Sequence, residues 1–340
     1  MTTSPTPTTA LSRKDFQTDQ DVRWCPGCGD YSILAAMQKV LPELGIPREQ
    51  FALISGIGCS SRFPFYMNTY GFHTIHGRAP AIATGVKAAN PDLSVWVITG
   101  DGDALSIGGN HLLHAIRRNV DLKILLFNNQ IYGLTKGQYS PTSEQGKKTK
   151  STPQGSVDSP LDPLSFVLGC NATFVARTID REPKHMNEVL RRAADHRGTA
   201  FVEIYQNCNI FNDGAFSVLT ERGTKEHRQL LLEEGKPLIF GPGGELCVTF
   251  DSWQFQVAKT AEVPENSIVV HREQAPVGYH QLLARLDRSV AVPLGVLRAT
   301  TDQPTWDELM HGQLAAARER SGTGDLQELL TGRNTWTVPG

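Results

Sequence analysis

Short apolar runs of strand length alternate with helix-like segments between residues 30 and 206. The apolar runs are residues 51–54, 93–99, 122–127 and 200–205, and apolar positions recur at helical spacing in residues 32–44, 78–89 and 184–197. A strand that is apolar throughout is typical of a parallel sheet that is buried under helices on both faces. We therefore predict an α/β fold with a mostly parallel sheet and helices on both faces.

The chain divides into a tail, a core domain and an extension. Residues 1–20 are rich in Thr, Ser and Pro, and we predict that they form a disordered tail. Residues 21–215 carry the alternating pattern and form the predicted core domain. Over residues 216–340 the charge density rises and the alternation weakens, which indicates a C-terminal extension that packs on the core or on a partner.

The charge balance and the apolar runs exclude several classes of protein. Lys and Arg number 33 and Asp and Glu number 35, and a net charge of −2 argues against nucleic acid or an acidic membrane as a partner. No stretch approaches the roughly 18 apolar residues of a membrane-spanning helix. The first residues lack the apolar core of a signal peptide, so we expect a cytoplasmic protein.

A glycine-rich turn and a pair of asparagines follow two of the predicted strands. Gly100-Asp101-Gly102 stands between an apolar strand and a helix, where backbone N–H groups approach a phosphate and a carboxylate reaches a hard cation. Asn128-Asn129 follows one helix and one strand later, and ligands in such folds bind where strands end. The spacing therefore predicts a magnesium and diphosphate site at this edge.

This pattern is similar to the thiamine-diphosphate motif, in which GDG is followed by NN after one helix and one strand. The resemblance implies that three groups hold Mg²⁺: the side chains of Asp101 and Asn129 and the main-chain oxygen of Ile131. The polar segment 135–163 is too long for a simple connection and is predicted to be functional or mobile. Within it, residues 135–142 are expected to cover the diphosphate.

Four of the six cysteines lie on loops of the predicted core domain. Two form the turn Cys25-Pro26-Gly27-Cys28, Cys59 follows a strand in GIGCSS, and Cys208 follows the strand that ends at residue 205. In a large chain without an export signal, such thiols indicate a metal or redox site and not disulfides. Four thiolates suit either zinc or an iron–sulfur cluster, and the spacing alone leaves both open.

Five segments occur together and in order: WCPGCG, GIGCSSR, HTIHGRAPAIATGVKAANPDL, GDGDALSIGGNH and NNQIYGLTKGQYSPT. Over residues 20–215 this combination resembles the beta subunits of 2-oxoacid:ferredoxin oxidoreductases. The resemblance implies a thiamine-diphosphate-binding fold and a [4Fe–4S] cluster held by Cys25, Cys28, Cys59 and Cys208. Cys170 and Cys247 match no ligand and are expected to be small buried hydrophobic residues.

The resemblance also implies which residues contact the cofactor. They are Ile57, Gly58, Cys59, Ser60, His76, Gly100, Asp101, Gly102, Asp103, Asn129, Ile131, Gly133 and Leu134. His76 is the predicted catalytic residue, while the Glu that activates the cofactor is expected from an alpha subunit in an α₂β₂ assembly.

The predicted substrate is 2-oxoglutarate, because Arg62 offers a bidentate donor for a distal carboxylate and Leu134 replaces a polar residue of pyruvate-specific relatives. The reaction implied by the resemblance forms succinyl-CoA from coenzyme A and passes electrons to ferredoxin. The cations Lys147, Lys148 and Lys150 are expected to form a solvated face; attraction of ferredoxin or coenzyme A is the alternative.

Three other functions are compatible with the same residues. The enzyme could act on pyruvate or a branched-chain 2-oxoacid. It could be a non-redox thiamine decarboxylase or carboligase whose cysteines bind structural zinc. A non-catalytic regulatory or scaffold subunit with a degenerate cofactor site is the third alternative, although the intact Asp101 and Asn129 argue against it.

Overall fold

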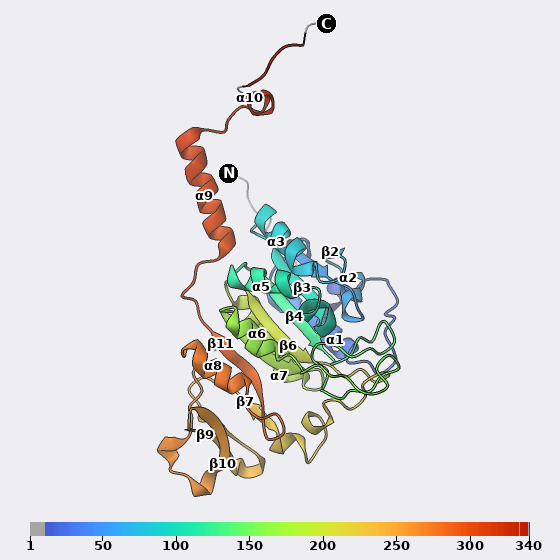
Figure 1. Cartoon of the computed structure of the whole chain (residues 1–340), viewed down its shortest axis with the longest axis vertical. Helices are drawn as coiled ribbons and strands as arrows, with labels where there is room; N and C mark the ends of the chain where they lie inside the picture. Colours follow the sequence, from blue (N-terminus) through green and yellow to red (C-terminus); the bar gives the residue numbers. More distant parts are fainter. Residues whose placement is uncertain (1–10, 333, 339) are drawn as a thin grey trace.

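An eight-stranded sheet forms the centre of the computed structural model, which describes residues 11–332, 334–338 and 340 (Figure 1). Its strands follow the order β2-β1-β3-β4-β6-β5-β11-β7. They are β1 (Phe51–Ser55), β2 (Tyr70–His73), β3 (Ser94–Gly100), β4 (Lys123–Asn128), β5 (Phe174–Ile179), β6 (Ala200–Tyr205), β7 (Gln229–Leu231) and β11 (Val292–Ala299). The first six are mutually parallel, and β11 pairs antiparallel with β5, so the mostly parallel sheet is confirmed.

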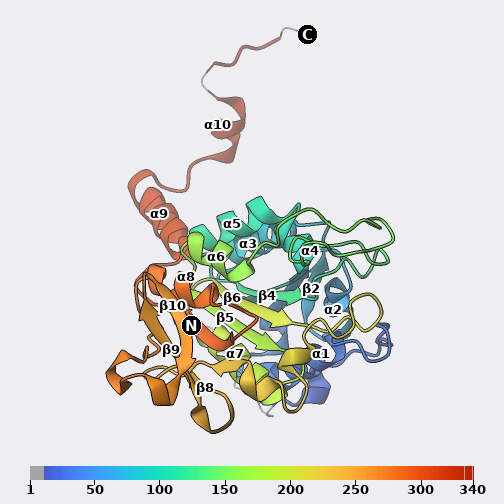
Figure 2. The ribbon, with the colours of Figure 1, turned by 60° about the horizontal axis from the view of Figure 1, so that its bottom comes forward.

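Helices cover both faces of this sheet, as predicted (Figure 2). One face carries α1 (Asp30–Glu43) and α7 (Pro183–Asp195), and the other carries α3 (Ala79–Ala89), α5 (Gly109–Arg117), α6 (Pro163–Gly169) and α8 (Val277–Ala284). Alternate residues of β4 enter the two hydrophobic clusters, Ile124 and Leu126 on one face and Leu125 on the other. This two-sided burial explains why residues 124–127 of the strand are all apolar.

The remaining short elements include α2 (Phe63–Tyr66) and α4 (Asp101–Leu105), which begin just after β1 and β3. The predicted helices and strands agree with the structure to within a few residues at each end. The sequence pattern did not identify β2, whose four residues are exposed at the edge of the sheet, or β5, β7 and β11.

The prediction of a disordered tail is wrong for residues 11–20, and residues 1–10 lie outside the described residues. Arg13–Phe16 forms a 3₁₀ helix whose Phe16 side chain is fully buried against Phe51. Gln17 then pairs with Met67 in an isolated bridge. A single aromatic anchor therefore fixes this segment to the domain.

The predicted boundary at residue 216 does not separate two cores. Strands β7 and β11 from the extension join the central sheet, and Leu230 and Leu297 belong to the same hydrophobic cluster as Ile124. A smaller antiparallel sheet follows β7, with β8 (Ile239–Phe240), β9 (Leu246–Asp251) and β10 (Gln254–Lys259). Residues 229–299 thus pack on the core.

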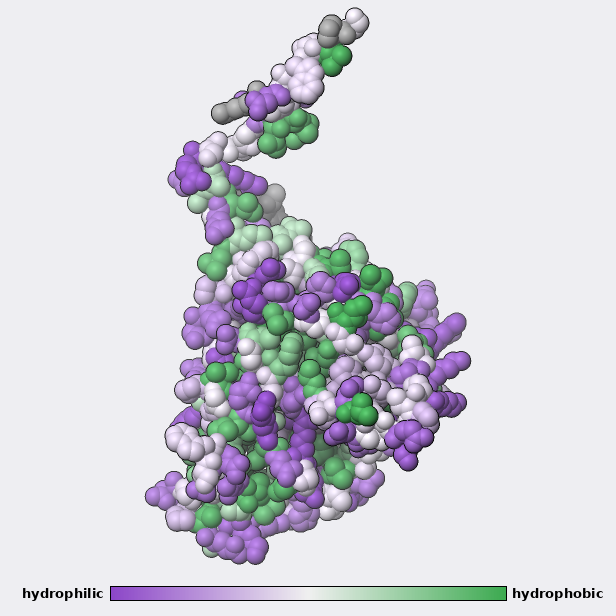
Figure 3. All heavy atoms as spheres, viewed as in Figure 1, coloured by the Kyte–Doolittle hydropathy of each residue, from purple (hydrophilic) through white to green (hydrophobic). Residues whose placement is uncertain are grey.

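The last helices, α9 (Trp306–Ser321) and α10 (Leu326–Thr331), leave the body as an arm (Figure 1). Hydrophobic side chains lie on the surface of this arm (Figure 3), and Leu329 is 78% exposed. Among the described residues, no helix combines the length and the apolar character needed to cross a membrane.

Candidate active site and cysteine cavity

One cavity brings together all thirteen residues that were predicted to contact the cofactor. We call it the cofactor cavity, and Phe127, Tyr132 and Thr135 complete its lining. It lies where β1, β3 and β4 end, because the loops that follow these neighbouring parallel strands meet at one edge of the sheet. Gly102 has no side chain, and a Cβ atom there would lie 2.1 Å from the Tyr132 ring, so only glycine lets that ring approach.

Asp101 places a buried carboxylate in the cofactor cavity, and no cationic side chain in the described part of the chain forms an ion pair with it. Its side chain is 2% exposed, and its Oδ2 accepts hydrogen bonds from Ser140 Oγ at 2.5 Å and Thr142 Oγ1 at 2.6 Å. Burial raises the pKa of Asp101 to about 6, although both hydroxyls stabilise the charged form. A buried oxygen ligand whose charge is not neutralised fits a divalent cation.

Asn129 and Ile131 line the same cavity at the end of β4. Asn129 Nδ2 donates to Gln206 Oε1 at 2.8 Å, which identifies the opposite side of the amide as its oxygen. That oxygen accepts the backbone N–H of Ile131 at 3.2 Å, and the positive φ of Gln130, 56°, turns the chain between them. The two donors predicted for Mg²⁺ besides Asp101 therefore belong to one short turn that lines the same cavity as Asp101.

Asp103 lines the cofactor cavity, but its carboxylate is committed to the protein itself. Its Oδ1 accepts the backbone N–H groups of Ile57 at 3.1 Å and Gly77 at 2.8 Å, and its Oδ2 accepts Thr99 Oγ1 at 2.8 Å. His76 Nδ1 lies 3.6 Å from Asp103 Oδ1, and the His76 side chain is 55% exposed. Asp103 therefore braces the loops around His76, whose ring remains at the open rim.

The four cysteines predicted as cluster ligands line a second cavity, the cysteine cavity. It shares Cys59, Asn129, Gly133 and Leu134 with the cofactor cavity, so the two have a common wall. A Cβ atom at Gly133 would lie 3.5 Å from Cys59 Sγ and 3.6 Å from Cys208 Sγ. The wall between the cavities is therefore only one residue thick at Gly133.

The spacing of the thiols distinguishes the two kinds of metal centre. All four cysteines are free, and among the described residues no three cysteine sulfurs lie within 4.8 Å of one another. Tetrahedral zinc with Zn–S bonds of about 2.3 Å requires sulfurs about 3.8 Å apart. In a four-iron cluster each thiolate binds a different iron, which needs a wider arrangement. The described thiols therefore do not form the close group that a tetrahedral zinc site requires.

Burial disfavours the thiolate forms of Cys59 and Cys28. It raises the pKa of Cys59 to about 12, with a further contribution from the buried Asp30, and it raises the pKa of Cys28 in the same way. A strongly Lewis-acidic group is needed to hold them deprotonated.

Three comparisons place the chain among known proteins. Residues 56–204 match the family described as "Thiamine pyrophosphate enzyme, C-terminal TPP binding domain". The chain is 56% identical to the 2-oxoglutarate oxidoreductase subunit KorB of Mycobacterium tuberculosis, over 98% of this chain and 90% of that protein. It is 46% identical to a 2-oxoacid:ferredoxin oxidoreductase subunit beta of Aeropyrum pernix, over 58% of this chain and 62% of that protein.

The chain belongs to the beta subunits of 2-oxoacid:ferredoxin oxidoreductases. A solved structure of the 2-oxoglutarate:ferredoxin oxidoreductase from Magnetococcus marinus, with 2-oxoglutarate, coenzyme A and succinyl-CoA bound, has the same fold. Its TM-score is 0.73 at 35% identity, and the alignment covers 94% of each chain. The predicted family and the thiamine-diphosphate-binding fold are both confirmed.

The two residues that were predicted to bind the substrate, Leu134 and Arg62, do not line the same cavities. Leu134 is 43% exposed and lines both cavities. Arg62 lines the cysteine cavity and not the cofactor cavity, and its Nη1 donates to the backbone oxygen of Arg23 at 2.5 Å. Its guanidinium therefore lies beyond the common wall, beside Cys59.

Cys170 and Cys247 are both buried, as predicted, and Cys170 belongs to the hydrophobic cluster that contains Ile124. The three predicted surface lysines differ from one another. Lys147 Nζ contacts Asn212 Oδ1 at 2.5 Å and so attaches its loop to the segment after Cys208, whereas Lys148 and Lys150 are exposed.

Sequence reasoning missed three residues beside the cysteines of this family member. Gln206 Nε2 lies 3.4 Å from Cys28 Sγ while its Oε1 accepts from Asn129, so one side chain joins both cavities. Trp24 Nε1 donates to the Cys59 carbonyl at 2.6 Å. Asp30 is 1% exposed, and burial raises its pKa to about 7. The only available signal was their position within two residues of a cysteine.

Proposed function

We propose that this beta subunit supplies the diphosphate half and the electron exit of an enzyme that oxidatively decarboxylates 2-oxoglutarate to succinyl-CoA and CO₂. The observation that carries the proposal is the wall shared by the cofactor cavity and the cysteine cavity. Names of relatives that act on 2-oxoglutarate support the substrate.

In this proposal the cofactor cavity holds thiamine diphosphate and Mg²⁺. Asp101, Asn129 and the main-chain oxygen of Ile131 bind the cation, and the backbone around Gly100 and Gly102 faces the diphosphate. When bound, thiamine diphosphate supplies the electron sink for decarboxylation of a 2-oxoacid. The buried carboxylate of Asp101 supports this assignment because it lacks a counter-charge.

Cys25, Cys28, Cys59 and Cys208 would hold a [4Fe–4S] cluster in the cysteine cavity, and such a cluster would supply the one-electron chemistry that ferredoxin requires. Cys59 lines both cavities, so the path from the cofactor to the cluster crosses a single residue. This adjacency favours oxidation over the non-redox alternative, and the wide spacing of the thiols disfavours structural zinc.

The other half of the active site comes from a partner. The cavity offers no residue that we assign as the activating Glu, so we infer that an alpha subunit supplies it, in an α₂β₂ enzyme that also binds coenzyme A. His76 stands at the exposed rim, braced through Asp103, where a partner closes over the cofactor. It is the proposed residue for contacts to the substrate or cofactor. The cytoplasmic location stays a prediction.

Specificity for 2-oxoglutarate is assigned to Arg62 and Leu134. Arg62 must reach across the common wall to meet the distal carboxylate, which its position beside Cys59 permits only if the side chain turns toward the cofactor. Arg62→Ala should raise KM for 2-oxoglutarate far more than KM for pyruvate. Equal changes for both oxoacids would instead support the pyruvate or branched-chain alternative.

The experiment that tests the function is anaerobic purification of the chain with its co-produced partner, followed by iron, sulfide and thiamine analysis. We expect four irons and four sulfides per beta subunit, bound thiamine diphosphate, and coenzyme-A-dependent turnover of 2-oxoglutarate with reduction of ferredoxin. Iron-free protein containing zinc would favour the non-redox alternative. Protein that binds no thiamine diphosphate would favour the scaffold alternative.

Single cysteine variants test the ligand set within the same preparation. Cys208→Ser should lose iron and sulfide, because Cys208 Sγ shares the cavity with the other three thiols. Cys170→Ser is the matched control, since Cys170 lies in the hydrophobic core away from both cavities. A full iron content in Cys208→Ser would remove this residue from the proposed set.

A further inference from the structure

The two oxygens of the Asp101 carboxylate have unequal surroundings. Oδ2 accepts hydrogen bonds from Ser140 Oγ at 2.5 Å and Thr142 Oγ1 at 2.6 Å. Among the described residues, no side chain donates a hydrogen bond to Oδ1. Two donors on one oxygen fix the rotation of the carboxylate, which leaves the other oxygen for a ligand in the cavity.

A second acceptor, the side-chain oxygen of Asn128, also contacts the Thr142 hydroxyl. Its Oγ1 lies 2.9 Å from Asn128 Oδ1, so its single proton is shared between Asp101 and Asn128. Asn128 is the first residue of the asparagine pair and is completely buried. It therefore orients a hydroxyl, while the neighbouring Asn129 faces the cavity.

A buried ion pair fixes the orientation of the Asn128 amide. Its Nδ2 donates to Glu203 Oε1 at 2.7 Å, and Glu203 Oε2 accepts Arg177 Nε at 2.7 Å. Both charged side chains are completely buried, and each neutralises the other. Because the amide nitrogen must face Glu203, the amide oxygen must face Thr142. The chain of contacts from β5 to Asp101 therefore has one orientation.

Ser140 and Thr142 belong to the long loop between β4 and α6, residues 129–162, which we call the β4–α6 loop. Near Asp101 the loop closes on itself, because Ser143 Oγ donates to the Gln130 carbonyl at 2.6 Å and the Leu161 N–H donates to the Pro141 carbonyl at 2.8 Å. The carboxylate of Asp101 is thus the point where this loop meets the end of β3.

We propose that Ser140 and Thr142 are positioning residues for the cation at Asp101, and that the same hydrogen bonds anchor the β4–α6 loop. A bound cation holds the Asp101 carboxylate in one orientation, which is the orientation that both hydroxyls contact. Cation binding and loop anchoring are therefore linked, and the linkage acts in both directions. The inference rests on the proposed function, since it requires a divalent cation at Asp101.

The test uses Thr142→Val in the enzyme purified with its partner subunit. We expect Mg²⁺ to bind about tenfold more weakly in the presence of thiamine diphosphate, because a hydrogen bond to a charged group is lost. Calorimetry measures the affinity. Limited proteolysis of residues 143–161 measures the loop, and Mg²⁺ should protect this segment in the wild type but not in Thr142→Val.

Two further variants separate the hydroxyl from the fold. Thr142→Ser keeps the hydroxyl and should retain the wild-type affinity and protection. Thr152→Val makes the same substitution in the same loop, where the hydroxyl contacts Thr149 at 2.7 Å, and should also match the wild type. If Thr142→Val fails to assemble, Ser140→Ala removes the other donor and carries the same expectation.

Wild-type affinity and wild-type protection in Thr142→Val would overturn this inference while leaving the proposed function intact. The same holds if Thr142→Ser binds Mg²⁺ as weakly as Thr142→Val. Wild-type enzyme that binds neither Mg²⁺ nor thiamine diphosphate would overturn the proposed function itself.

Discussion

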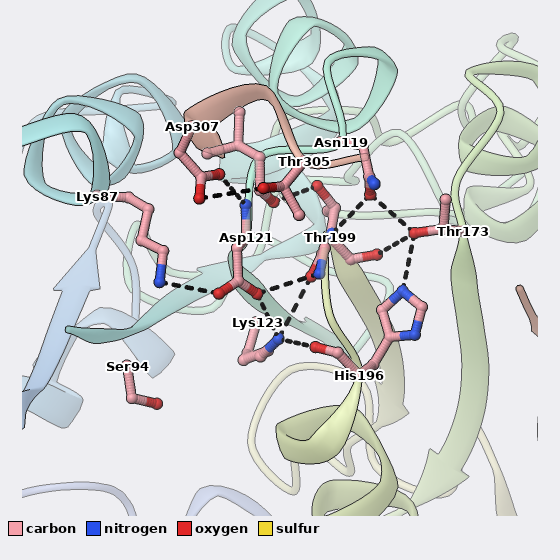
Figure 4. Close-up of polar contacts among 12 residues, drawn as sticks. Lys87, Ser94, Asn119, Asp121, Lys123, Thr173, His196, Thr199, Thr305 and Asp307 are labelled. Atoms are coloured by element: carbon pink, nitrogen blue, oxygen red, sulfur yellow. Dashed lines mark hydrogen bonds and ion pairs between the residues drawn. The ribbon is translucent and has the colours of Figure 1, made fainter. Parts of the chain in front are cut away.

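Strand β4 carries a buried polar network at each of its ends, and the two networks differ in how they treat charge. At the amino end, Asp121 lies 2.8 Å from the ammonium groups of both Lys87 and Lys123 (Figure 4). Lys123 also donates to the backbone oxygen of His196, and Asp307 at the start of α9 accepts the Asp121 N–H at 3.0 Å. The Asp121 charge is therefore paired with two ammonium groups within the protein.

At the carboxyl end, Asp101 has hydroxyl and backbone N–H donors, and no ion pair joins it to a cationic side chain among the described residues. The pKa values express the difference. Burial raises the pKa of Asp101 to about 6, whereas at Asp121 the charges of the two lysines outweigh burial and lower the pKa to about 2. A neutralised network stabilises the fold, while a network with an unpaired charge is ready for a ligand. Four predictions examine this contrast.

The largest effect is expected when the amino-end network loses its carboxylate. Asp121→Ala leaves the buried Lys123 without its partner and should cost about 3–5 kcal/mol of folding free energy. Thermal or denaturant unfolding of the assembled enzyme measures the loss, and Mg²⁺ affinity should not change. The exposed Asp92→Ala serves as the control, with an expected change below about 0.5 kcal/mol.

Asp101→Asn should have the opposite effect on stability. The native pKa of about 6 lies above the ordinary aspartate value of 3.8, so the ionised carboxylate destabilises the metal-free wild type as the pH rises from about 4 to 6. Removing the charge should stabilise the metal-free protein at pH 7 by about 2–3 kcal/mol and abolish Mg²⁺ binding. Unfolding curves at pH 4 and pH 7 measure the change. A variant that is less stable than the wild type at pH 7 would contradict the contrast.

The affinity for Mg²⁺ should depend on pH at the carboxyl end alone. Protons compete with the cation for Asp101, so the affinity should fall about tenfold per pH unit below pH 6 and level off above it. Calorimetric titration with thiamine diphosphate between pH 4.5 and 8, corrected for protonation of the diphosphate, measures the profile. An affinity that stays constant down to pH 4.5 would show that Asp101 is not a ligand.

The smallest effect is expected on removing the end of the arm. Truncation after Gly322 deletes α10 but keeps Thr305 and Asp307, which anchor α9 to the amino-end network. We expect a change in folding free energy below about 0.5 kcal/mol and an unaltered Mg²⁺ affinity. A large loss of thermal stability would reveal that the arm stabilises the assembled enzyme.

The strands of the central sheet differ in how well the sequence predicts them. Strands β1, β3, β4 and β6 are apolar on both faces, so their residues are recognisable without knowledge of their neighbours. Strand β2 is exposed along its length, and β11 pairs with a strand far away in the chain, so neither carries a local signal.

For the site too, residues within local motifs could be predicted, whereas contacts between distant segments could not. The thirteen predicted cofactor residues lie within short motifs, and the structure gathers them in one cavity. The hydrogen bonds from Thr142 to Asp101 and from Asn128 to Glu203 join segments 41 and 75 residues apart, which no local pattern reveals. Arg62 follows Cys59 closely in sequence, yet it faces the neighbouring cavity because the turn after β1 directs it away.

The antiparallel pairing of β5 with β11 has a consequence for synthesis. Strand β5 ends at Ile179, whereas β11 begins at Val292, more than one hundred residues later. At about 5–20 residues per second, the ribosome needs on the order of ten seconds to supply that partner. During this interval β5 presents an open hydrogen-bonding edge, which is a hazard for aggregation in a nascent chain. The C-terminal extension therefore covers the open edge of β5 only late in synthesis.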